Sequence, residues 1–133
     1  MEPSDLVALF DQQAAGYDRQ WAKTAPIRDC LYFLLEPLLA PLPAEARVLC
    51  VGVGTGQEMA HLAAAHPGWS FTAVEPSGAM LEACRRRADA DGFATRCRFH
   101  HGFLETLPAD APYDAATCFL VSQFITARAE RVR

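Results

Sequence analysis

The feature that most constrains the fold is a run of alternating glycines, Gly52, Gly54 and Gly56, directly after the apolar segment 47–51. A continuous apolar segment of this kind is typical of a parallel strand covered on both faces. Glycine there permits a tight turn and lets a ligand approach the main chain, and a following helix offers free N–H groups. About 20 residues after Gly54, a second predicted strand leads into Glu75, where a carboxylate can accept hydrogen bonds from both hydroxyls of an adenosine ribose. The unit predicts a binding site for a ligand that contains a nucleoside.

The rest of the chain extends this unit into a four-stranded sheet. Strands that alternate with helices predict an α/β fold, a doubly wound and mainly parallel sheet with flanking helices. Right-handed crossovers place the first strand inside the sheet and the loops after the strands along one edge. Residues 1–43 are expected to form an N-terminal helical segment and residues 44–133 the core of a single domain. In chain order the predicted elements are helices 5–20 and 27–39, strand 47–51, helix 57–65, strand 70–74, a helix capped by Ser77 that ends near 91–92, and strands 97–101 and 114–121.

The glycine spacing indicates which kind of nucleoside-containing ligand the site can bind. A dinucleotide fingerprint needs a small residue at the last position of G-x-G-x-x-G, and the chain has Gln57 or Met59 there. Glu58 would repel a pyrophosphate unless its side chain points away from the ligand. A nicotinamide- or flavin-dependent oxidoreductase is therefore the weaker alternative, and the chain has no Gly-Lys-Ser/Thr of a P-loop.

The strand with G-x-G-x-G, followed by an acid at the end of the second strand, resembles the class I S-adenosylmethionine-dependent methyltransferases. The resemblance covers about residues 11–124 and includes the segment from Ala73 to Ser77. It implies a Rossmann-like sheet, S-adenosylmethionine as the cofactor and methyl transfer to an acceptor that the sequence does not identify. Within the family, the N-terminal helices also resemble the carboxy-S-adenosylmethionine synthases, although the arginine that those enzymes need cannot be placed in this chain.

The resemblance also implies which residues contact the cofactor. The glycine turn would line the methionine and ribose part, Glu75 would bind the ribose hydroxyls, and Pro76 or Met80 would pack against adenine. Tyr17 would close over the cofactor's carboxylate, with helix packing as the alternative for Tyr17 and Trp21. The full set of expected cofactor-binding residues is Gly52, Val53, Gly54, Thr55, Gly56, Glu75, Pro76, Met80, Phe103, Leu104, Phe119 and Tyr17.

Two of these positions depart from the family pattern or have a second interpretation. Phe103 stands where the family usually has an acid, so adenine is expected either to stack on Phe103 or to bind the backbone N–H of Leu104. Phe119 lies where methyltransferases line the reaction pocket, yet it is also a plausible core residue. No catalytic residue is predicted, because orientation of the two reactants supplies much of the acceleration in an in-line methyl transfer.

The family's sheet has seven strands, whereas four are predicted here, so the sheet is expected to stop after the fourth strand. The apolar segment 115–121 would then be an exposed edge, which favours pairing with another strand. The chain is expected to be shortened, to form a homodimer through this strand, or to receive the remaining strands from another polypeptide. A non-catalytic or regulatory half-domain that binds the cofactor or a partner through this edge is the main alternative to an enzyme.

Composition excludes several other functions. Twelve Lys and Arg against sixteen Asp and Glu give a net charge of −4, which does not favour nucleic acid as a partner, and a small-molecule acceptor is favoured. The run 85–87, three arginines, is expected to lie on the solvated face of a helix.

The five cysteines lack C-x-x-C spacing, and His100 and His101 would point to opposite faces of a strand, so no metal is expected. Free thiols, a polar N-terminus and no membrane-spanning run predict a cytoplasmic protein.

Overall fold

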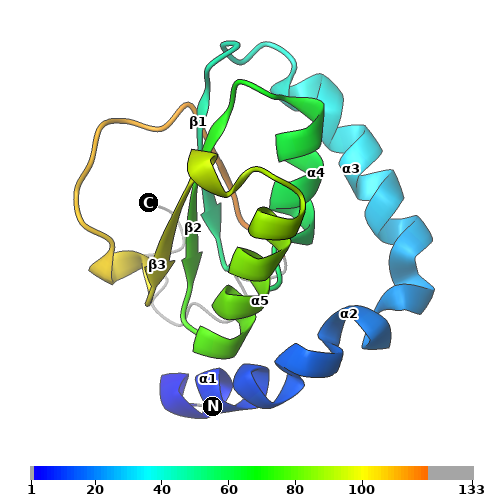
Figure 1. Cartoon of the computed structure of the whole chain (residues 1–133), viewed down its shortest axis with the longest axis vertical. Helices are drawn as coiled ribbons and strands as arrows, with labels where there is room; N and C mark the ends of the chain where they lie inside the picture. Colours follow the sequence, from blue (N-terminus) through cyan, green and yellow to red (C-terminus); the bar gives the residue numbers. More distant parts are fainter. Residues whose placement is uncertain (1, 120–133) are drawn as a thin grey trace.

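The computed structural model describes residues 2–119, which form a parallel sheet with helices on one face and a curved N-terminal segment of helices (Figure 1). Its helices are α1 (Pro3–Gln13), α2 (Tyr17–Gln20), α3 (Ala25–Leu39), α4 (Gln57–Ala65) and α5 (Gly78–Ala90). Its strands are β1 (Arg47–Val51), β2 (Ser70–Glu75), β3 (Cys97–His101) and β4 (Ala115–Thr117). Short 3-10 turns lie at Ala14–Gly16, Ala22–Thr24, Ala94–Arg96 and Leu104–Thr106.

The sheet has the order β3-β2-β1-β4 with every neighbouring pair parallel, which confirms the predicted doubly wound α/β class. Val48 of β1 pairs with Phe71 of β2 on one side and Ala115 of β4 on the other. β1 is therefore an interior strand, as the crossover rule requires. Its alternate residues Val48 and Cys50 have no exposed surface, because helices cover the face they point to.

Helices α4 and α5 pack on one face of the sheet and bury the apolar side of each helix (Figure 1). Met59 and Leu62 of α4 and Leu81 and Cys84 of α5 are spaced three residues apart, so each pair lies on the inner side of its helix. Together with Phe71, they make the centre of the core. The bounds predicted for α4, β1 and β3 agree with the structure, because apolar periodicity and glycine or proline ends mark these elements clearly.

The N-terminal segment differs from the continuous helix predicted over 5–20. It is broken at Ala14–Gly16, where Gly16 leaves the helical region with φ −111° and ψ 3°. Glycine has a low helix propensity, so ending the helix at this position loses little stability. The break lets α1 and α2 follow the carboxyl edge of the sheet, below the strand ends in Figure 1.

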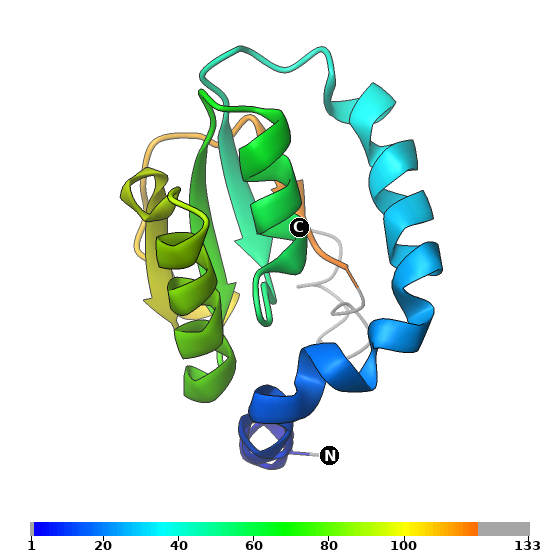
Figure 2. The same cartoon turned by 45° about the vertical axis from the view of Figure 1, so that its right-hand side comes forward.

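Helix α3 stands beside α4 (Figure 2). Much of its apolar surface is uncovered. Ile27, Phe33 and Leu38 are 73%, 74% and 75% exposed, whereas Leu35 and Leu39 pack against the core. Polar and aromatic contacts also join α3 to the region of α4. Glu36 lies 3.2 Å from the Nε2 atom of His61 and 2.9 Å from that of His66, and Tyr32 stacks on His61.

Strand β4 is shorter than the predicted strand 114–121, and residues 120 and 121 lie outside the described part of the chain. The start of β4 is fastened to β1, since the Asp114 carboxylate accepts from Arg47 N at 2.8 Å and Asp114 N donates to Arg47 O at 2.8 Å. Within residues 2–119, β4 pairs with β1 alone. No helix in this part of the chain has the length and apolar character needed to cross a membrane.

Candidate functional site

The glycine turn adopts a backbone conformation that few other residues tolerate. Gly52, Gly54 and Gly56 have φ values of 63°, 58° and 84°, all in the left-handed region. The amides of Gly52 and Val53 donate to the Val74 carbonyl at 2.8 and 3.1 Å, which fixes the turn against β2. The sequence motif therefore forms a rigid turn at the carboxyl end of β1.

Two of the glycines serve different purposes. A Cβ atom added to Gly54 would meet no heavy atom within 4 Å, so this residue leaves open space at the sheet edge. A Cβ atom added to Gly56 would lie 2.6 Å from the Cys84 sulfur, so this residue lets α4 approach α5 closely. Gly54 thus provides access to the main chain, and Gly56 provides packing.

Glu75 ends β2 with its carboxylate held by two backbone amides. Gly54 N donates to Oε2 at 2.9 Å and Ser77 N donates to Oε1 at 3.0 Å. The side chain is only 6% exposed, and burial raises the pKa of Glu75 while the two amide hydrogen bonds oppose this shift. Each carboxylate oxygen retains a second lone pair. The group is therefore fixed in position, next to the open side of Gly54, and can accept two further hydrogen bonds.

Helix α1 is tied to this edge by an aspartate that sequence reasoning missed. Ser77 caps α5 by accepting from Met80 N at 3.2 Å, and its own hydroxyl donates to Asp11 Oδ1 at 2.5 Å. Ala79 N also donates to Asp11, at 3.2 Å. The Ser77 hydroxyl is the main cause that lowers the pKa of Asp11. No sequence signal marks Asp11, because its partners lie more than 60 residues away in the chain.

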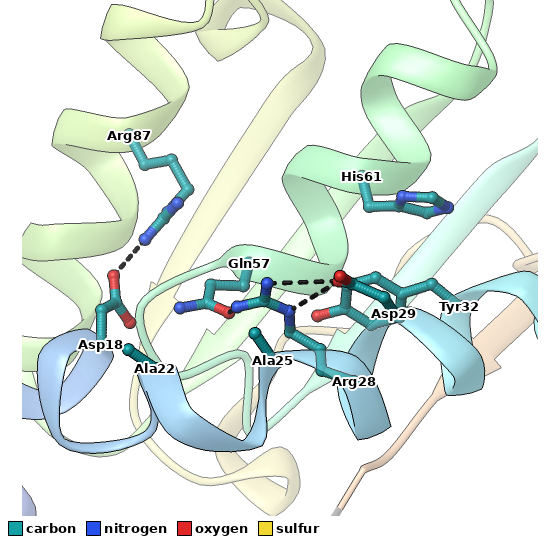
Figure 3. Close-up of a pocket in the computed structure, with 9 residues that line it drawn as sticks. All are labelled: Asp18, Ala22, Ala25, Arg28, Asp29, Tyr32, Gln57, His61 and Arg87. Atoms are coloured by element: carbon teal, nitrogen blue, oxygen red, sulfur yellow. Dashed lines mark hydrogen bonds and ion pairs between the residues drawn. The ribbon is translucent and has the colours of Figure 1, made fainter.

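A second tie joins α2, the glycine turn and α5. The Thr55 hydroxyl donates to Asp18 Oδ1 at 2.6 Å, and Arg87 donates to the Thr55 carbonyl at 2.9 Å. Arg87 also forms an ion pair with Asp18 (Figure 3). The expectation that all three arginines of the run 85–87 face solvent was thus wrong for Arg87, which reaches inward because α2 places a carboxylate opposite it.

The other residues predicted to bind the cofactor differ in how much of their surface a ligand could reach. Tyr17 is half-buried, and burial together with the nearby Asp18 and Glu75 carboxylates raises its pKa, so it lies close to the Glu75 side of the turn. Met80 is 1% exposed and belongs to the interior, so it offers almost no surface to a ligand. The remaining residues are Val53, which is buried, Pro76 and Phe119, which are half-buried, and Phe103 and Leu104, which are each 40% exposed after β3.

A cavity of about 510 Å³ lies between the N-terminal helices and the helices on the sheet (Figure 3). Arg28 crosses it, donating to the Gln57 side chain at 2.5 Å and pairing with Asp29 at 3.2 Å. The wall is mainly polar and includes Asp18, Tyr32, His61 and Arg87. Among residues 2–119, no cluster of three or more His, Cys, Asp or Glu side chains could hold a metal ion.

Comparison with known proteins identifies the class to which this fold and site belong. Residues 48–132 match the family described as the methyltransferase domain, and this match covers more than half of the chain. The chain belongs to this family, and the predicted resemblance is confirmed.

Particular relatives agree with this assignment. The demethylmenaquinone methyltransferase of Clavibacter sepedonicus is 34% identical over 118 residues, which are 87% of this chain and 46% of that protein. A methyltransferase from Thiobacillus denitrificans, solved with S-adenosyl-L-homocysteine, is 32% identical with a TM-score of 0.64, over 76% of this chain and 40% of that one. A methyltransferase from Geobacter sulfurreducens, solved with the same ligand, is 26% identical with a TM-score of 0.64 and the same coverage. The chain spans less than half the length of these relatives.

S-adenosyl-L-methionine is the cofactor of this family, and the residues present fit it. The open side of Gly54 admits a ligand against the main chain, and Glu75 presents a fixed acceptor to a diol such as ribose. The cofactor supplies the methyl group as a sulfonium, and this chain's residues would hold its nucleoside.

Proposed function

We propose that this chain binds S-adenosyl-L-methionine at the glycine turn and that the site serves methyl transfer. The observation that carries the proposal is the Glu75 carboxylate, which two backbone amides hold beside the open face of Gly54. A buried acid that is positioned by main-chain donors and still has free lone pairs is well suited to the two hydroxyls of a ribose.

The proposed contacts follow the sheet edge. Gly52, Val53, Gly54, Thr55 and Gly56 line the ligand with their main chain, because the Val53 and Thr55 side chains are buried. Pro76, Phe103 and Leu104 surround the adenine, with Met80 supporting them from the interior. Tyr17 closes over the carboxylate of the ligand, and Phe119 lines the reaction pocket.

Calorimetric titration with S-adenosylhomocysteine and, separately, with NAD tests the cofactor. We expect saturable binding of S-adenosylhomocysteine and none of NAD. Glu75→Ala should weaken binding at least about tenfold, since two hydrogen bonds to a charged group are lost. Binding of NAD, or an unchanged affinity in the variant, would contradict the proposed site.

The acceptor is proposed to be a small molecule. The net charge of −4 does not favour nucleic acid, and the polar cavity beside Gln57 has the size of an ordinary small-molecule pocket. Transfer of a labelled methyl group to a set of small acceptors, compared with RNA and protein, tests this. Label that appears only in macromolecules would contradict it.

A regulatory or self-pairing role is a second candidate, because β4 has a free edge within the described residues. We propose that two copies pair through this edge. We also propose that the protein is cytoplasmic, because its five free cysteines would stay reduced there. A monomer at high concentration in sedimentation would contradict the pairing, and recovery of the protein outside the cytoplasmic fraction would contradict the location.

A further inference from the structure

Glu58 is a buried carboxylate that the site as described so far does not use. It lies in the first turn of α4, two residues after Gly56, and is 7% exposed. Its Oε1 atom is 3.5 Å from the Thr117 hydroxyl, and its Oε2 atom has no hydrogen-bond partner among residues 2–119. An unsatisfied carboxylate oxygen in the interior is costly, so a partner that binds there would explain why the residue is an acid.

The groups around Glu58 provide no positive charge. None of the ion pairs within residues 2–119 includes Glu58. Tyr32 of α3, Cys50 of β1 and Cys118 after β4 lie close enough to be affected by its charge, and burial raises the pKa of all three, to about 12 for Tyr32. These neighbours are therefore neutral near pH 7 to 8. Burial also raises the pKa of Glu58, to about 8, and the hydrogen bond from the Thr117 hydroxyl opposes this shift.

The position of Glu58 along the sheet indicates what the partner is. The order β3-β2-β1-β4 places Glu75 at the end of β2, whereas Glu58 follows β1 and contacts Thr117 of β4. A nucleoside whose ribose is held by Glu75 and whose base lies toward β3 must extend its 5′ substituent across β1 toward β4. Strands are about 4.8 Å apart, so the step from β2 to the boundary of β1 and β4 is about 7 Å. A chain of a few bonds covers this span.

We propose that Glu58 is the counter-ion for the α-ammonium group at the amino-acid end of the cofactor, with the Thr117 hydroxyl orienting its carboxylate. The assignment rests on the proposed function, because S-adenosylmethionine and S-adenosylhomocysteine carry this ammonium group on the 5′ substituent. The ammonium would donate to Oε2, which is buried and has no hydrogen-bond partner among residues 2–119, so binding requires the side chain to turn toward the ligand. The two buried acids of residues 2–119 would then hold the two ends of one ligand.

Two ligands that differ at the amino-acid end test the assignment by calorimetry. S-adenosylhomocysteine has the ammonium group, whereas 5′-methylthioadenosine has the same adenosine and sulfur without it. Glu58→Gln should weaken S-adenosylhomocysteine at least about tenfold and change methylthioadenosine less than about twofold. Glu75→Gln should weaken both ligands, Thr117→Val should weaken S-adenosylhomocysteine by a smaller factor, and the exposed control Glu82→Gln should weaken neither.

Proton release gives a readout that a purely structural role would not produce. Near pH 7 the wild-type chain should release close to one proton when S-adenosylhomocysteine binds, measured in buffers of different ionisation enthalpy, because the ammonium needs the ionised carboxylate. Glu58→Gln should lose this release. Equal weakening of both ligands, or an unchanged affinity for S-adenosylhomocysteine in Glu58→Gln, would overturn the assignment alone. A wild-type chain that binds neither ligand would overturn the proposed function and, with it, the assignment.

Discussion

At the residue scale, the two buried acids of residues 2–119 have different environments. Glu75 has a backbone amide on each oxygen, whereas Glu58 has a distant hydroxyl on one oxygen and no partner on the other. Burial raises the pKa of both groups, but the main-chain donors oppose the shift only at Glu75. The stability of the chain should therefore depend on pH mainly through Glu58.

The expected pH dependence follows from the raised pKa of Glu58, about 8 in the folded chain against 4.5 for an ordinary glutamate. Its contribution to stability is complete below pH 4.5 and is lost progressively as the pH rises to about 8. Over this range the unfolded chain has released the proton, whereas the folded chain still holds it. Glu58→Gln should remove a loss on the order of 3 kcal/mol, measured by urea unfolding from about pH 5 to about pH 8.5. An equally steep loss in Glu58→Gln would contradict this, and Glu82→Gln is the control that should keep it.

Gly54 and Gly92 form a matched pair that separates backbone strain from ligand access. Both have positive φ, 58° and 79°, and an added Cβ would meet nothing within 4 Å at either site. Gly54→Ala and Gly92→Ala should therefore each cost about 1 kcal/mol of stability through strain. Only Gly54→Ala should also reduce S-adenosylhomocysteine binding, because its methyl group occupies the open face of the turn. Equal affinities in the two variants would show that the ligand does not approach Gly54.

At the scale of elements, α4 and α5 are brought together by the absence of a side chain at Gly56. The Cys84 side chain fills the space that a Cβ would need. The N-terminal helices are joined to the same region by Asp11 on Ser77 and by Asp18 on Thr55 and Arg87. The cofactor edge is thus assembled from three separate parts of the chain.

A double-mutant cycle tests the packing of α4 on α5. Gly56→Ala should destabilise the fold by about 2–4 kcal/mol, because its Cβ overlaps the Cys84 sulfur and its φ is 84°. Cys84→Ala removes that sulfur, so the double variant should recover part of the loss, with a coupling of at least about 1 kcal/mol in urea unfolding. Strictly additive effects would mean that strain alone, without the overlap, explains Gly56.

At the scale of the whole molecule, apolar surface on α3 remains uncovered in residues 2–119. Ile27, Leu34 and Leu38 expose most of their side chains and are spaced seven and four residues apart, so they share one side of α3. Exposed apolar surface of this kind marks an interaction site. The relatives are more than twice as long as the segment they share with this chain.

The uncovered side of α3 should give this 133-residue chain a second surface for self-association, in addition to the proposed β4 edge. Leu34→Glu combined with Leu38→Glu should weaken association in sedimentation velocity at least about tenfold, since burial of two large apolar side chains on one side of α3 is lost. Leu9→Glu, an exposed apolar residue on α1, is the control that should leave association unchanged. Association that persists in the double variant would place the contact at the β4 edge.

Sequence alone was enough to predict the strands, the glycine turn and Glu75 at the end of β2, because periodicity, glycine spacing and a strand-ending acid are local signals. With the crossover rule it also predicted that the first strand is interior, which the sheet order confirms. It also indicated the Ser77 cap, which the structure confirms. The tertiary structure alone decided that Gly54 is open and Gly56 is packed, that Arg87 turns inward, and that Glu58 is buried without a donor. Each of these depends on groups distant in the chain, Cys84, Asp18 and Thr117, that only folding brings within reach.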